Sequence, residues 1–138
     1  MPDLTELRAA ARAAREFAYA EYSHFTVGAA LETADGRRFT GANVENSSYG
    51  LTICAERTAV FAAVLAGARE IAAIAVTGPD GVTTTPCGAC RQVLREFSAA
   101  SVPLSYANAD GTWTDTTVGD LLPHSFDASA LRAARGTG

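Results

Sequence analysis

The residues of this sequence best suited to chemistry are its three cysteines, Cys54, Cys87 and Cys90. Cys87 and Cys90 form a C-x-x-C pair within the segment PCGAC, whereas Cys54 stands in the earlier segment ICAER. Thiolates bind Zn²⁺ at ~2.3 Å, and a zinc ion with three protein ligands keeps one coordination position open, as catalytic sites do. The three cysteines are therefore candidate ligands of one catalytic zinc ion.

Two charged residues follow Cys54 closely and could complete such a site. Three thiolates more than neutralise a divalent cation, and the surplus negative charge makes zinc a weaker acid toward its bound water. Glu56 could take the proton from that water and deliver it to the reacting group of a substrate. Arg57, three residues after Cys54, could offset the surplus charge.

Each of these features also has a simpler interpretation. A C-x-x-C pair occurs in redox-active proteins and in structural zinc sites, and cysteine packs as a small apolar residue. A glutamate in the first turn of a helix interacts favourably with the helix dipole, and a surface arginine is commonly solvated. The joint pattern, C-A-E at one predicted helix start and P-C-x-x-C at another, favours the catalytic hypothesis.

The apolar pattern predicts that strands and helices alternate along the chain. The predicted strands cover residues 25–33, 38–42, 71–77, 102–107 and 113–118. The predicted helices cover 3–19, 55–66 and 88–99, with one or two short ones in 120–135. A short loop containing Asp110 and Gly111 joins the last two strands, so we predict that these are antiparallel. The sequence thus predicts an α/β fold, a three-layer α/β/α arrangement with a mixed five-stranded sheet.

Local signals indicate where these elements begin and end. Asp3 with Glu6 has the spacing of a capping box for the first helix. We expect Thr52 to cap the second helix, and Gly67 suits the left-handed conformation beyond its end. The turn of the first hairpin falls at ADGR, residues 34–37, and the polar segment 43–52 is predicted to be a loop.

The cysteines lie at the predicted starts of the second and third helices. A helix N-terminus favours negative charge and lowers the pKa of a thiol, which promotes the ionised form that a metal needs. In α/β sheets, ligands commonly bind outside the carboxyl ends of strands, near helix N-termini. The expected topology therefore brings the candidate zinc ligands to the ligand-binding edge of the sheet.

Composition limits the possible functions. The 138 residues fit one domain, 1–138, and 48% apolar with 19% charged residues predict a packed core. The net charge is −4 and all 11 basic residues are scattered arginines, which argues against binding a nucleic-acid backbone. No segment approaches the roughly 20 apolar residues of a membrane span. An odd number of cysteines does not suit a disulfide framework, so we expect a cytoplasmic protein that binds neither membranes nor nucleic acids.

At the cysteine motifs the sequence resembles the zinc-dependent nucleoside and nucleotide deaminases. Cys54-Ala55-Glu56 and Pro86-Cys87-Gly88-Ala89-Cys90 match the three-cysteine form of their signature. Over nearly its full length the chain is similar to the small homotetrameric cytidine deaminases. The matching segments are FTVGAAL at 25–31, NVENSSYG at 43–50, PCGACRQV and LLPHSF at 121–126.

The resemblance implies hydrolytic deamination of cytidine and deoxycytidine to the uridine forms, with one Zn²⁺ per chain and Glu56 as the proton carrier. It also implies a homotetramer that shares its active sites. In that family, residues matching Asn43 and Glu45 bind the ribose hydroxyls, and the residue matching Phe25 lines the base pocket. The backbone N–H of Ala55 would bind the base edge or the reacting oxygen. Phe126 would stack on the base in a neighbouring subunit, and Tyr49 would lie at a subunit boundary. Ser47, Ser48, His24 and His124 receive no role.

Three other functions remain open at this point. A blasticidin-type antibiotic deaminase shares the zinc signature, but Glu45 and Tyr49 favour a cytidine deaminase. A polynucleotide deaminase is disfavoured by the acidic chain without lysine. A non-catalytic zinc or thiol-redox module would need a fourth ligand or a reversible disulfide between Cys87 and Cys90, and no fourth cysteine exists.

Overall fold

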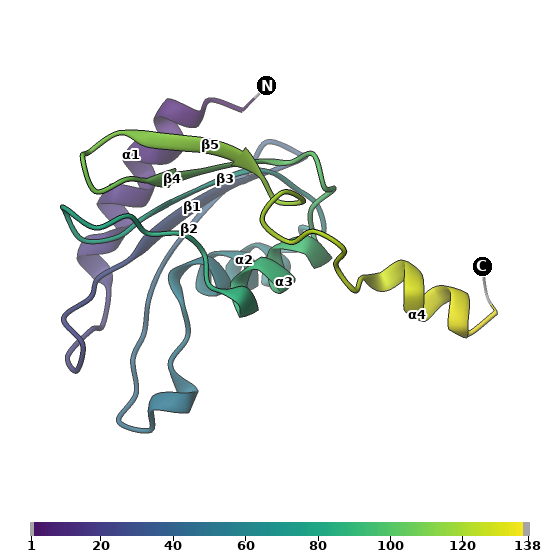
Figure 1. The fold of residues 1–138 in the computed structure, drawn as a ribbon, viewed down its shortest axis with the longest axis horizontal. Coiled ribbons are helices and arrows are strands. Elements are labelled where there is room, and N and C mark those ends of the chain that lie inside the picture. The colour runs from purple at the N-terminus through teal and green to yellow at the C-terminus, as the bar shows by residue number, and fades with distance from the viewer. Residues whose placement is uncertain (1, 137–138) are drawn as a thin grey trace.

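A mixed five-stranded sheet forms the centre of the molecule (Figure 1). The computed structural model describes residues 2–136, and its strands lie in the order β2-β1-β3-β4-β5. Only β3 and β4 run parallel, and the other neighbouring strands are antiparallel. The predicted mixed sheet with an antiparallel last pair is therefore confirmed. The strands are β1 Gly28–Thr33, β2 Arg38–Ala42, β3 Ile71–Thr77, β4 Pro103–Ala107 and β5 Trp113–Thr117.

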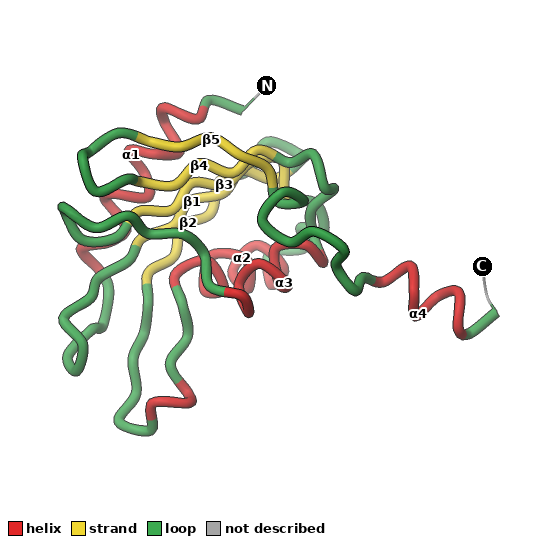
Figure 2. The backbone as a smooth tube through the Cα atoms, in the orientation of Figure 1, coloured by secondary structure: helices red, strands yellow, loops and turns green. Residues whose placement is uncertain are grey.

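Helices cover both faces of this sheet, which makes three layers (Figure 2). Helix α1 (Leu4–Ala14) packs on one face, and α2 (Ala55–Leu65) and α3 (Gly88–Glu96) pack on the other. Side chains of β1 alternate between the faces: Ala30 belongs to the α1 core, whereas its neighbours Ala29 and Leu31 belong to the core under α2 and α3. None of the helices within residues 2–136 is long and apolar enough to cross a membrane.

The first helix is shorter than its periodicity predicts. It ends at Ala14, continues as a 3-10 turn at Arg15–Phe17, and becomes extended at Ala18. Tertiary pairing explains the difference: the Tyr19 amide donates to the Asn43 carbonyl (2.9 Å), and the Tyr19 carbonyl accepts from the Glu45 amide (2.8 Å). These bonds use backbone groups that a longer helix would have kept for itself.

The predicted helix caps are only partly correct. The Asp3 carboxylate accepts from the amides of Thr5 and Glu6, at 2.9 and 3.4 Å, as a cap should. The Glu6 side chain pairs with Arg38 instead of completing the capping box. Thr52 was the wrong cap for α2, because the extended N-cap residue is Cys54, which makes no side-chain cap bond.

Other boundaries differ from the prediction by a few residues. β1 begins at Gly28 rather than Phe25, because the side chain of Asn43 occupies the backbone groups of Phe25 and Val27. α3 ends at Glu96, and the described residues after β5 contain one helix, α4 (Ala128–Ala134). Figure 1 shows that segment passing beside α3 before α4 projects away from the sheet.

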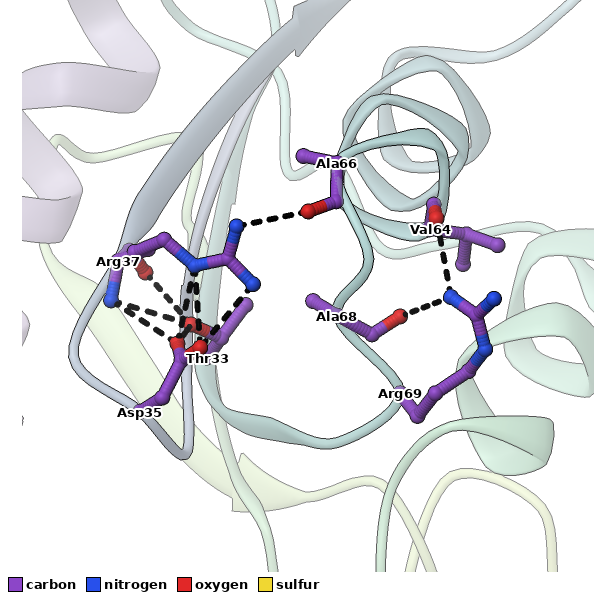
Figure 3. Close-up of polar contacts among 7 residues, drawn as sticks. All are labelled: Thr33, Asp35, Arg37, Val64, Ala66, Ala68 and Arg69. Atoms are coloured by element: carbon purple, nitrogen blue, oxygen red, sulfur yellow. Dashed lines mark hydrogen bonds and ion pairs between the residues drawn. The ribbon is translucent and has the colours of Figure 1, made fainter.

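Two arginines hold the C-terminal end of α2 (Figure 3). Arg37, in the turn between β1 and β2, donates to the Ala66 carbonyl at 2.8 Å. Arg69 donates to the carbonyls of Val64 and Ala68, at 2.9 and 2.8 Å. The last carbonyls of a helix have no partners within the helix, and cations there interact favourably with the dipole. The two guanidinium groups therefore cap the C-terminal end of α2.

Candidate metal centre and active site

The three cysteine sulfur atoms form one cluster. The Sγ atoms of Cys54 and Cys87 are 3.8 Å apart, those of Cys87 and Cys90 are 3.5 Å apart, and all three lie within 4.8 Å of one another. Tetrahedral bonds of ~2.3 Å to zinc place two sulfurs about 3.8 Å apart. All three cysteines are free thiols. Both the spacing and the chemistry of these donors therefore fit one zinc ion.

Two helix N-termini bring these sulfurs together. Cys54 is the N-cap residue of α2, Cys87 is the N-cap residue of α3, and Cys90 lies in the first turn of α3. The unpaired amides and positive dipole ends of both helices therefore point toward the cluster, where they stabilise thiolates. Cys90 is buried, Cys54 is half-buried and Cys87 is exposed, so the cluster reaches the surface on one side.

The thiols of the cluster differ in acidity. The pKa of Cys54 is lowered, first by a hydrogen bond from the Cys90 thiol and then by Arg57. The pKa of Cys90 is raised, first by that same hydrogen bond and then by burial. A hydrogen bond from one thiol to another stabilises the ionised form of the acceptor, so it favours ionisation of Cys54 over ionisation of Cys90.

The structure places Arg57 against the cluster. Its Nη2 donates to the Sγ of Cys54 at 3.4 Å, and its own pKa is raised by this bond. The Nε atom of Arg57 is buried and has no hydrogen-bond partner among residues 2–136. The guanidinium therefore serves the sulfur cluster rather than a surface carboxylate.

Glu56 provides a buried acid beside the sulfurs. Its side chain is 4% exposed in the first turn of α2. Desolvation by burial, and to a smaller extent the negative charge of Cys54, together raise the pKa of Glu56 to about 7. A carboxyl group with a pKa near neutrality can both accept and return a proton at physiological pH.

The predicted ribose contacts lie in the loop after β2. Asn43 is buried; its Oδ1 accepts from the Val27 amide at 2.9 Å, and its Nδ2 donates to the Phe25 carbonyl at 2.7 Å. The structure thus joins Asn43 to the predicted base-pocket residue Phe25. Thr58 of α2 donates to the Ala42 carbonyl at 3.0 Å, so this loop leaves β2 beside the first turns of α2.

Glu45 and Tyr49 line one surface hollow of about 430 Å³. The amides of Tyr22 and Ser23 donate to Glu45 Oε1 at 3.0 and 3.1 Å, and the Ser23 hydroxyl donates to Oε2. These bonds, the Ser23 hydroxyl first, lower the pKa of Glu45. Tyr49 is 75% exposed, with its ring 6.1 Å from that of Tyr22.

Ala55 and Phe126 lie at opposite extremes of burial. The Ala55 side chain is fully buried, and its amide belongs to the first turn of α2, where amides have no helical acceptor. Phe126 is 62% exposed in the segment before α4, and its carbonyl accepts a hydrogen bond from Gln92 at 2.8 Å. Within one chain, Phe126 is thus an exposed side chain whose backbone is connected through Gln92 to α3, the helix that carries Cys90.

Sequence reasoning missed Tyr22 and Ser23, which hold Glu45. They precede the first predicted strand and stand more than twenty positions before Glu45. No periodicity or motif connects positions that far apart. The only signal was their place beside Phe25, itself a predicted pocket residue.

The fold and the site define a zinc-binding α/β hydrolytic enzyme of the deaminase class. The family model described as "Cytidine and deoxycytidylate deaminase zinc-binding region" matches residues 2–106, which include all three cysteines and Glu56. Its zinc-binding character agrees with the sulfur cluster, which corresponds to one zinc ion per chain.

Similarity to individual proteins identifies the family within this class. The cytidine deaminase of Sporosarcina psychrophila is 47% identical, over 96% of this chain and 97% of its own. That of Halalkalibacterium halodurans is 50% identical, over 86% and 89%. The crystal structure of cytidine deaminase from Burkholderia pseudomallei has a TM-score of 0.85 and 52% identity, and covers 91% of this chain and 100% of that one. The chain belongs to the cytidine deaminase family.

Proposed function

We propose that this chain catalyses the hydrolytic deamination of cytidine and deoxycytidine to uridine and deoxyuridine, with release of ammonia. The observation that carries this proposal is the buried carboxyl group of Glu56 directly beside three clustered sulfurs. The cytidine deaminases at 47% and 50% identity support the choice of substrate.

Glu56 carries the protons of this reaction. Bound zinc, held by Cys54, Cys87 and Cys90, supplies Lewis-acid activation of water. Glu56 takes one proton from the attacking water and delivers it to N3 of the cytosine ring. It then takes the second proton from the oxygen that is now bonded to C4 and delivers it to the 4-amino group, so the C4–N bond breaks and the C4=O bond forms. The sum is one water and one cytidine consumed, and one uridine and one ammonia formed. Burial of Glu56 excludes bulk water, which would otherwise compete for these protons.

Asn43 and Glu45 bind the sugar hydroxyls. After its two backbone bonds, Asn43 keeps one N–H and one lone pair, and Glu45 keeps acceptor capacity after its three donors. A carboxylate and an amide can together accept from and donate to two neighbouring hydroxyls. Phe25 lines the base pocket, and the backbone amide of Ala55 donates to the base edge or the reacting oxygen.

The active enzyme is a homotetramer in which subunits share active sites. Support comes from large apolar side chains left exposed on the single chain: Tyr49 at 75%, Phe126 at 62% and Phe17 at 84%. Phe126 reaches the base in a neighbouring subunit, and Tyr49 lies at a subunit boundary. The chain acts as one catalytic domain, in the cytoplasm, where thiols stay reduced, and on free nucleosides rather than polynucleotides.

Purified protein with a measured zinc content tests this proposal. Deamination is followed by the ultraviolet absorbance of cytidine, deoxycytidine and blasticidin S. We expect turnover of the two nucleosides, loss of turnover when a chelator removes zinc, and recovery when zinc returns. Preferred turnover of blasticidin S would favour the antibiotic deaminase, and a zinc-loaded chain inactive on all three would favour a non-catalytic module. Sedimentation as a monomer would remove Phe126 from the active site.

A further inference from the structure

Arg91 of α3 joins two segments that are far apart in the sequence. Its Nε donates to the Pro86 carbonyl at 2.7 Å, and its Nη1 donates to the Leu121 carbonyl at 3.0 Å. Its backbone amide donates to the Cys87 carbonyl at 2.9 Å. Arg91 thus bonds to Pro86 and Cys87, which position the sulfur of Cys87, and also to the turn that follows β5.

The next residue of α3 continues this connection. Gln92 donates from Nε2 to the Phe126 carbonyl at 2.8 Å. Two successive side chains of one helix therefore hold both ends of the segment 121–126 by their backbone carbonyls. Figure 1 shows this segment passing beside α3 on its way to α4.

We propose that Arg91 is a positioning residue whose side chain connects the segment Pro86–Cys87 to the turn at Leu121. In the same proposal, Gln92 holds the backbone of Phe126 in a fixed position relative to that segment. The proposal rests on the proposed function, in which Cys87 is a zinc ligand and Phe126 contacts the base bound in a neighbouring subunit. Through α3, the placement of a metal ligand and the placement of an aromatic residue 39 positions later are coupled.

The chemistry of arginine suits this role. A guanidinium group presents several donors in a rigid plane, so it can bridge two carbonyls at once, whereas a lysine ammonium acts as a single flexible point. Cys87 is exposed, and Pro86 before it is buried. The segment before α3 is therefore buried at Pro86 and exposed at Cys87, and the Arg91 side chain bonds to the buried residue, Pro86.

The rate of zinc release tests the role of Arg91. Zinc-loaded wild type, Arg91→Met and Arg91→Lys are mixed with an excess of a coloured chelator, and metal transfer is followed by absorbance. Groups that support metal ligands typically contribute about 10- to 100-fold to affinity, so we expect Arg91→Met to release zinc about tenfold faster. Arg91→Lys should fall between Arg91→Met and wild type, because it keeps one of the two bonds.

Arg69→Met is the matched control. Arg69 also donates to two backbone carbonyls, but at the C-terminal end of α2, away from the sulfurs. Its zinc release should stay within about twofold of wild type. Equal acceleration in Arg69→Met and Arg91→Met would mean general destabilisation and would overturn the proposal. If Arg91→Met does not fold, wild-type release from Arg91→Lys overturns it equally.

The variant Gln92→Met tests the role of Gln92 separately from the role of Arg91. We expect its zinc release to match wild type, its KM for cytidine to rise severalfold and its kcat to change less than about twofold. An unchanged KM would overturn the role of Gln92. Zinc release requires no substrate, so it decides the role of Arg91 even if the wild-type chain proves inactive on cytidine, a result that would overturn only the proposed function.

Discussion

Arg57 and Cys54 are joined across one turn of α2 by a hydrogen bond of 3.4 Å from guanidinium to sulfur. The bond helps to lower the pKa of Cys54, after the larger effect of the Cys90 thiol. It also places a permanent positive charge beside a ligand set that would otherwise carry surplus negative charge. Arg57 therefore affects how strongly protons compete with zinc for Cys54.

Replacing Arg57 by glutamine should weaken zinc binding, and more so at low pH. Without the guanidinium the pKa of Cys54 rises, so at a given pH a smaller fraction of this thiol is ionised, and the loss grows as pH falls. We expect roughly tenfold weaker binding near neutrality and a larger loss near about pH 6. Competition with a chelator of known affinity measures this, and Arg57→Lys, which keeps the charge, is the control. A loss that is the same from about pH 6 to about pH 8 would contradict the mechanism.

Replacing Glu56 by glutamine should remove activity but keep the metal. The amide has a similar shape but cannot carry a proton, and general acid–base groups contribute about 100- to 10,000-fold. Metal analysis should still give about one zinc per chain, because Glu56 is not a ligand. Turnover of cytidine at the parent rate would exclude Glu56 as the proton carrier.

Replacing Ser23 by alanine should affect substrate binding through Glu45. The hydroxyl is the largest cause of the lowered Glu45 pKa, and its removal frees one oxygen of the carboxylate to move. One such hydrogen bond corresponds to a rise in KM of about threefold, with kcat nearly unchanged. Thr112→Val, which removes a comparable hydroxyl from Asp110 in a turn after β4, should leave KM unaffected. Equal effects in both variants would contradict a specific role for Ser23.

Replacing Gly41 by alanine should destabilise the protein. A Cβ atom at this position would overlap the Ala55 carbonyl and the Ala59 amide, so α2 would have to move away from β2. Overpacking of this kind costs about 1–3 kcal/mol in the free energy of unfolding, which urea denaturation measures. Gly50 has open space around it, so Gly50→Ala should stay within about 0.5 kcal/mol of wild type. A stable Gly41→Ala variant would show that β2 and α2 tolerate separation.

The hairpin turn between β1 and β2 should contribute stability that depends on pH. Hydrogen bonds from Thr33 first, and then Arg37, lower the pKa of Asp35 to about 2. Because the unfolded value is about 3.9, this contribution is present above about pH 4 and is lost as pH falls toward about 2. Urea midpoints measured across that range should fall more steeply for wild type than for Asp35→Asn. Parallel curves would contradict the prediction.

The sequence by itself determined the local elements and the identity of the chemistry. All five strands occur near their predicted positions, because short apolar or β-branched runs and the turn residues that bound them are local signals. Cys54, Cys87 and Cys90 could be named as candidate zinc ligands, and Glu56 as a candidate proton carrier, because thiolates bind zinc and a carboxyl group can transfer a proton. The predicted first helix extended too far, to Tyr19, because apolar periodicity gives no information about the β-bridge between Tyr19 and Val44.

Only the tertiary structure decided which distant groups meet. The sulfurs of Cys54 and Cys87 approach to 3.8 Å because α2 and α3 pack side by side on one face of the sheet. The hydrogen bond from Ser23 to Glu45 joins positions 22 residues apart, and the bond from Arg91 to Leu121 joins positions 30 residues apart. Such contacts follow from strand order and helix packing, which depend on how the whole core excludes water, and no short segment of sequence contains that information.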